Sequence, residues 1–152
     1  MADRGAVWTG AIPGGNVLFA GDNVHNFKAG AAITRGMVVA IHGTGVDFTV
    51  WPCILGTTLV PLGIATETVA SGAMCAVAGL GCIAYCQQET NAVDMDAGTQ
   101  LVITDSAGQV GALAAGAPEK FLVGILLETS DASALSYERC LVLCGLPTQI
   151  HA

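Results

Sequence analysis

The stretch Gly63-Ile64-Ala65-Thr66-Glu67-Thr68 occurs a second time in the chain, as Gly124-Ile125-Leu126-Leu127-Glu128-Thr129. Each copy follows an apolar run, residues 60–62 in the first case and residues 121–123 in the second. A short apolar run that ends in a glutamate and a polar turn is typical of a β-strand leading into a turn. The repeat therefore points to two β units of similar sequence.

Segments on either side of the repeated stretch also recur, and in the same order. Three apolar runs in the same order indicate a single small β unit that is duplicated and folded against itself. We predict that the two halves, about residues 33–80 and 95–145, have similar structures. The flanking pairs are residues 36–41 with 98–103 and residues 74–79 with 139–145.

The rest of the sequence also favours β-structure over helix. No window of 11 or more residues has a clean helical period, and 20 glycines supply turn positions that need a positive φ. Residues 111–117 and 131–137 have a weak helical pattern, and we interpret the first as a loop because it contains two glycines. We predict an all-β fold, a small barrel or sandwich. The predicted strands are residues 37–41, 47–52, 59–66, 73–80, 82–86, 100–104, 121–127 and 138–144.

The N-terminal segment, residues 1–27, is predicted to be an extended arm that precedes a single β domain, residues 28–152. Its glycines and Pro13 interrupt any period, yet it contains large apolar side chains that a disordered tail would lack. We therefore expect the arm to pack on a neighbouring subunit or on another protein. The expected contact residues are Trp8, Ile12, Leu18, Phe19 and Phe27.

Composition narrows the possible partners. Only 11% of the residues are charged, against a usual quarter, so a chain of this size covers its surface thinly with charge. No run of about 18 apolar residues is present, so we expect no membrane partner and predict instead a homo-oligomer, most simply a trimer. The net charge of −7 and the dispersed basic residues argue against nucleic acid. The first residues do not lead into the apolar segment of a secretory signal.

Four of the six cysteines have a regular spacing, Cys82 with Cys86 and Cys140 with Cys144. Residues four apart on a strand lie roughly 13 Å apart, too far for their sulfurs to share one zinc ion. Pairing between strands leaves a metal site or a disulfide open. Buried thiols are the favoured interpretation, because free cysteine packs as a small apolar residue.

The sequence contains no coherent catalytic pattern. Glu67 and Glu128 are candidates for paired acid–base carboxylates, but each ends a strand and enters a turn, where it is placed to accept backbone N–H bonds. His25, His42 and His151 are dispersed in predicted loops. A Cys–His nucleophile stays open, although no residues are arranged to indicate one. We expect no enzyme activity, no cofactor and no metal.

Four segments together resemble a known protein family. They are similar, in order and spacing, to small proteins of tailed phages that are encoded near the major capsid protein and include capsid decoration (cement) proteins. The likeness covers roughly residues 28–145, and the cysteine content and the long arm depart from it. The segments are residues 29–40, 61–73, 97–110 and 123–132.

The resemblance implies a β-rich virion protein, without catalysis or cofactor, that binds the exterior of a phage-like capsid and stabilises it. It implies the major capsid protein as partner, a trimer as the common assembly, and a place on the outer capsid surface after synthesis in the host cytoplasm. The alternative is a cellular β-barrel ligand-binding module or enzyme subunit. A Cys–His pair clustered in a deep pocket would favour that alternative.

Overall fold

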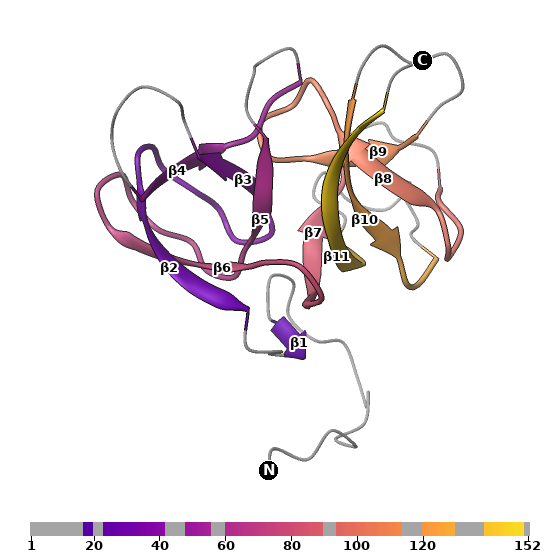
Figure 1. The fold of residues 1–152 in the computed structure, drawn as a ribbon, viewed down its shortest axis with the longest axis horizontal. Coiled ribbons are helices and arrows are strands. Elements are labelled where there is room, and N and C mark those ends of the chain that lie inside the picture. The colour runs from indigo at the N-terminus through magenta and orange to yellow at the C-terminus, as the bar shows by residue number, and fades with distance from the viewer. Residues whose placement is uncertain are drawn as a thin grey trace.

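The computed structural model describes residues 17–19, 23–41, 48–55, 60–89, 94–113, 120–129 and 139–150. All the regular elements among them are β-strands, which confirms the predicted all-β fold (Figure 1). Accordingly, these residues contain no helix that is long and apolar enough to cross a membrane. The strands are β1 (Val17–Phe19), β2 (Val24–Ala29), β3 (Val38–Ile41), β4 (Thr49–Pro52), β5 (Pro61–Ala65), β6 (Met74–Ala78), β7 (Ile83–Gln87), β8 (Gln100–Ile103), β9 (Val110–Ala112), β10 (Lys120–Leu126) and β11 (Arg139–Ile150).

Five strands in the first part of the chain close into a small barrel in the order β2-β4-β3-β5-β6. The neighbours are antiparallel except β2 and β4, which run parallel and complete the closure. We refer to this barrel, residues 24–78, as unit 1. Closure leaves the barrel without a free sheet edge.

The remaining strands form a second sheet in the order β1-β7-β11-β10-β8-β9. Strands β7 to β11, residues 83–150, are called unit 2 and lie beside unit 1 (Figure 1). A parallel bridge between Gln88 and Val110 connects the end of β7 to β9. This bridge corresponds to the parallel contact between Ala29 and Val50 that closes unit 1.

The two units share the same strand pairs in the same register. β3 pairs with β4 and β5 as β8 pairs with β9 and β10, and β6 and β11 follow in the same way. The irregularity in the pairing of β3 with β5 recurs in the pairing of β8 with β10. Corresponding residues therefore face the same way in both units. The irregular pairs are Val39–Gly63 followed by Ala40–Pro61 in unit 1, and Leu101–Gly124 followed by Val102–Leu122 in unit 2.

The turn that leads into each unit's irregular strand pair also has the same geometry in both. Gly36 has a φ of 89° and donates its N–H to the Ala65 oxygen at 2.8 Å. Gly98 has a φ of 92° and donates its N–H to the Leu126 oxygen at 2.7 Å. A positive φ is inexpensive only for glycine, which explains the residue type at both positions. The segments repeated in the sequence thus lie on equivalent strands.

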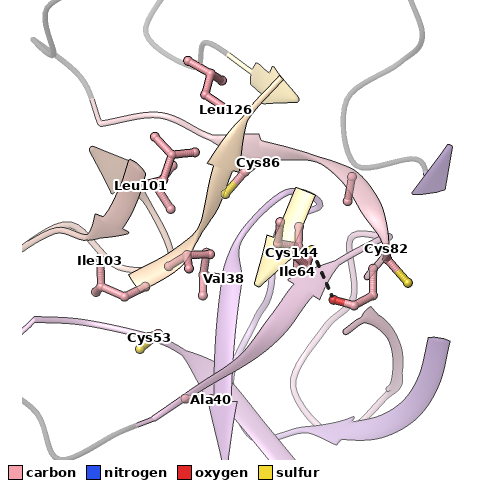
Figure 2. Packing of buried hydrophobic residues seen from close by; sticks show 14 of the residues in the cluster. Val38, Ala40, Cys53, Ile64, Cys82, Cys86, Leu101, Ile103, Leu126 and Cys144 are labelled. Carbon is pink, nitrogen blue, oxygen red and sulfur yellow. Dashed lines mark hydrogen bonds between the residues drawn. The ribbon is translucent and has the colours of Figure 1, made fainter. Parts of the chain in front are cut away.

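Two apolar clusters form the core. One fills the barrel of unit 1 and includes Ile33, Val39 and Val50. The other fills unit 2 and continues into the contact between the units, where Val38 and Ile64 of unit 1 lie among residues of unit 2 (Figure 2). The two units are therefore packed together through one continuous apolar cluster. Its fully buried members include Val38, Ala40, Ile64, Ala78, Cys82, Ala84, Cys86, Leu101 and Val110.

The structure differs from the sequence-based expectation in several places. β1 (Val17–Phe19) is a strand within the segment that we assigned to the arm, and β11 continues to Ile150, beyond the predicted end at residue 144. β2 begins at Val24, so residues 24–27, which we assigned to the arm, belong to the barrel. β9 lies where we expected a loop, because Gly111 permits the close approach of the Thr104 side chain, whose Cγ2 would be 3.0 Å from a Cβ. Residues 1–16 and the weak helical pattern at 131–137 lie outside the described residues.

Candidate interaction surface

The residues expected to make contacts occupy two different strands. Leu18 and Phe19 belong to β1, which pairs with β7 of the same chain. Phe27 lies on β2 and packs, half-buried, against the core of the unit 1 barrel. Trp8 and Ile12 lie outside the described residues. The contact role of these five residues stays a prediction.

Large apolar side chains are exposed at one end of the unit 1 barrel. Phe48 is 75% exposed, Met74 58% and Ile41 45%. They follow one another along the strand order β6-β2-β4-β3, because Met74 pairs with Lys28, and the Lys28 N–H donates to the Phe48 oxygen at 2.8 Å. We refer to Ile41, Phe48 and Met74 as the Phe48 rim. An exposed apolar group of this kind indicates an interaction site.

Phe48 also has an unfavourable backbone conformation. Its φ is 53°, in the left-handed region, and it is the non-glycine residue with a positive φ among the described residues. That conformation costs a bulky residue about 1–2 kcal/mol, and the exposed ring recovers little of this within the chain. Strain at an exposed aromatic residue is therefore a second indication that Phe48 acts in an interaction.

A cavity of about 560 Å³ lies where the two units meet. Gln87 fixes this junction, since its backbone N–H donates to the Gly36 oxygen at 2.9 Å and its side-chain Nε2 donates to the Arg35 oxygen at 2.8 Å. The Oε1 atoms of Gln87 and Gln109 are buried without a partner in the described part of the chain. Among the described residues, the lining mixes polar and apolar side chains and includes no thiol, imidazole or carboxylate; it consists of Thr34, Arg35, Met37, Thr68, Gln87, Ala107 and Gln109.

The cysteines are placed as apolar core residues. Cys82 and Cys144 face each other, with the Cys144 N–H donating to the Cys82 oxygen at 2.9 Å, and all the cysteines with described side chains are buried thiols outside any disulfide. Burial raises the pKa of Cys144 to about 12 and the pKa of Cys53 and Cys75 to about 11. Because the thiolate is the reactive form, these thiols are inert at neutral pH.

Cys86 on β7 lies directly opposite Cys140 on β11, so the structure brings the two Cys-x3-Cys segments side by side as cross-strand pairs. Within the described residues, no three histidine, cysteine, aspartate or glutamate side chains come close enough together to hold a metal ion.

The repeated glutamates stand at equivalent positions in the two units. Glu67 accepts the backbone N–H of Ala76 at 2.9 Å and so ties the β5–β6 turn to β6. Burial, together with the charge of Glu128, raises the pKa of the Tyr85 hydroxyl. The Glu67 contact is the backbone hydrogen bond that we predicted for a carboxylate at the end of a strand.

Sequence reasoning missed the Phe48 rim. The special position of Phe48 can be recognised when β4 is aligned with β9, which the strand pairing allows because Ile41 pairs with Val50 as Ile103 pairs with Val110. In that alignment Phe48 corresponds to Gly108 of the other unit, since each lies two residues before the aligned valine. Neither β4 nor β9 belongs to the segments that are repeated in the sequence. A phenylalanine at the position of a turn glycine was the available signal.

Two packed all-β units carry an exposed apolar rim, a feature that indicates a surface for binding another protein. Comparison with family models agrees, because the model described as phage cement protein matches residues 18–142. The matched region includes both units from β1 to the first part of β11. The chain therefore belongs to the phage cement protein family. A search of curated proteins found no significant match.

Proposed function

We propose that this protein decorates a phage capsid: it binds the outer surface of the shell through the major capsid protein and stabilises it. The observation that carries the proposal is membership of the phage cement protein family across residues 18–142. A cement protein is a structural component of the virion, so the proposed role involves no catalysis.

Charge and surface chemistry support the exterior position. The chain has 12 acidic and 5 basic residues, so it would be repelled by packaged DNA on the inner side of the shell. The Phe48 rim provides exposed apolar area of the kind that protein interfaces bury. The low charged fraction favours a homo-oligomer, most simply a trimer, assembled in the host cytoplasm or on the shell.

The alternative of a ligand-binding module or enzyme subunit has weaker support. That alternative called for a Cys–His pair in a deep pocket, whereas the described residues that line the junction cavity include neither cysteine nor histidine. The buried thiols have raised pKa values and are poor nucleophiles.

The test adds the purified full-length chain to DNA-filled capsids that lack it. Only an exterior protein can bind after packaging, so we expect co-sedimentation that saturates, together with a higher temperature of DNA release. Capsids that already carry the protein are the control, because their sites are occupied. Failure to bind filled capsids, or binding without any gain in their thermal stability, would contradict the proposal.

A further inference from the structure

The backbone of one glycine makes the hydrogen bonds by which a turn of unit 2 docks on unit 1. Gly108 lies in the turn between β8 and β9, and its oxygen accepts the Val38 N–H at 2.8 Å. Its own N–H donates to the Cys53 oxygen at 2.7 Å. The φ of Gly108 is 72°, and a Cβ there would lie 2.6 Å from the Met37 Cβ. The turn therefore touches unit 1 so closely that only glycine fits.

The groups of unit 1 that receive this glycine belong to neighbouring chain segments. The Cys53 N–H donates to the Val38 oxygen at 2.9 Å, as in an antiparallel pair. The other two groups of the pair, the Val38 N–H and the Cys53 oxygen, are joined through Gly108. The glycine thus completes a strand pair that unit 1 leaves open at this point.

Unit 2 contains the same open pair at Gln100 and Leu113. Gln100 is the counterpart of Val38, as the registers of β3 with β5 and of β8 with β10 show. The Leu113 N–H donates to the Gln100 oxygen at 3.0 Å, which makes Leu113 the counterpart of Cys53. In the described part of the chain, no glycine turn joins the Gln100 N–H to the Leu113 oxygen as Gly108 does in unit 1.

The Gln100 N–H points to the outer side of its strand pair. The N–H and C=O groups of one strand residue point to the same side, and the Gln100 oxygen faces Leu113. On the other side of β8, the Leu126 N–H donates to the Thr99 oxygen at 2.9 Å, so the next pair along, Gln100 with Ile125, is not hydrogen-bonded. The Gln100 N–H is therefore placed to bind a group from outside β10.

The side chains around the open pair differ in burial between the units. In unit 1, Val38 and Ile64 are fully buried under unit 2. In unit 2, Gln100 is exposed and its partner Ile125 is 42% exposed. We refer to the Gln100 N–H, the Leu113 oxygen and the Ile125 side chain as the Gln100 face. It is the uncovered counterpart of a face that is covered in unit 1.

The covered face shows what kind of partner the uncovered one fits. That partner is a tight turn whose glycine, in the left-handed conformation, offers both its N–H and its C=O. A second copy of the chain has no such turn to spare among its described residues, because each described glycine with a positive φ already donates its N–H within the chain. These glycines are Gly36, Gly72, Gly81, Gly98 and Gly108.

We propose that the Gln100 face binds a glycine-containing turn of the capsid protein, in the way that unit 1 binds the Gly108 turn. The inference rests on the proposed function and names the part of the chain that contacts the shell. Backbone hydrogen bonds at Gln100 and Leu113 fix the register of the turn, and its apolar flank covers Ile125.

The first test is hydrogen–deuterium exchange of the full-length chain, read at single amides. In the free chain the Val38 N–H should be protected by its bond to Gly108, whereas the Gln100 N–H should exchange rapidly. On capsids the Gln100 N–H should slow by at least about tenfold. Unchanged exchange on capsids would overturn the inference, and so would protection that appears in the free chain as its concentration rises, because the occupant would then be a second copy.

The second test measures capsid binding by full-length variants whose fold is checked by circular dichroism. Ile125→Thr keeps a β-branched side chain but removes apolar area, and should weaken binding by at least about tenfold. Gln100→Val introduces the residue type of Val38 and keeps the N–H, so it should bind at least as tightly as the unsubstituted chain. Loss of binding by Gln100→Val would assign the contact to the Gln100 side chain and contradict the backbone role. Leu80→Thr is the matched control, since Leu80 is 49% exposed in the β6–β7 turn and should leave binding unchanged.

The unsubstituted chain distinguishes failure of this inference from failure of the proposed function. If that chain binds filled capsids while Ile125→Thr binds equally well, the Gln100 face is not the contact and the inference is wrong, but decoration of the capsid stands. If that chain does not bind capsids, the proposed function fails and the inference fails with it.

Discussion

Replacing Gly63 with alanine tests whether close approach of two strands holds the unit 1 barrel together. Gly63 lies in β5, and a Cβ there would point at the backbone of β6. It would fall well inside contact distance of the Ala78 oxygen and 2.9 Å from the Ala78 carbonyl carbon. Backbone atoms in a closed barrel have no alternative rotamer, so the clash can be relieved only by separating β5 from β6.

The expected cost follows from that separation. Overpacking of a rigid core costs about 1–3 kcal/mol, and each strand hydrogen bond lost adds about 1 kcal/mol. The pairs next to the clash are Ile64–Ala78 and Ala65–Val77, so two bonds are at risk. We expect Gly63→Ala to lower the free energy of unfolding by about 3–5 kcal/mol, which shifts the Tm of a chain this size by roughly 10 °C.

Urea and thermal unfolding of the full-length protein, followed by circular dichroism, measure the effect. Gly72→Ala is the control, because Gly72 has a φ of 87° with nothing within 4 Å of its Cβ position. That change carries only the conformational cost of about 1 kcal/mol. If the two variants prove equally stable, the reasoning about strand approach is refuted.

Four further experiments have expected outcomes. Gly108→Ala should destabilise the protein more than Gly98→Ala, because both have positive φ values but only Gly108 is in close contact with the other unit; urea midpoints measure the difference. Glu67→Ala should cost about 1 kcal/mol by removing the hydrogen bond to β6, and Tm scans should show no loss if the carboxylate is merely solvated. Ellman's reagent should leave Cys53 and Cys144 unmodified at pH 7.5 until urea is added. Because burial raises the pKa of both thiols to about 11 and about 12 in the folded chain, while an unfolded thiol titrates near about 8.5, stability measured by urea titration should fall as pH rises above about 9.

The all-β fold could be predicted from the sequence because short apolar runs between glycines have few alternatives. Residues 36–41 and 98–103 were matched by sequence alone, and they contain the equivalent strands β3 and β8. β2 and β7 were not matched, since a polar strand such as β2 and an apolar strand such as β7 have little sequence in common. Their equivalence lies in backbone pairing and not in side-chain type.

The candidate interface depends on information that the sequence pattern does not contain. An exposed phenylalanine and a buried one look alike in a sequence, and only the backbone shows that Phe48 has a φ of 53°. The contrast between Val38, which is buried, and Gln100, which is exposed, likewise becomes meaningful only when both are known to occupy one position of a repeated fold. Sequence comparison of repeats therefore needs the strand register before its differences can be interpreted.

The apolar residues that accompany the low charge of the chain fall into two groups, those buried between the units and those left exposed. Part of the apolar content is used within the molecule, where Val38, Ala40 and Ile64 of unit 1 are buried under unit 2. A duplicated chain hides such a face without any partner, so the charged fraction by itself is a weaker sign of an oligomer than we first inferred. The stronger sign is the asymmetry between the units. In unit 2 Ile125 is 42% exposed, whereas its counterpart Ile64 in unit 1 is fully buried, and in unit 1 Phe48 is 75% exposed. Both side chains are exposed in a single copy, so burying them is what a protein partner would gain.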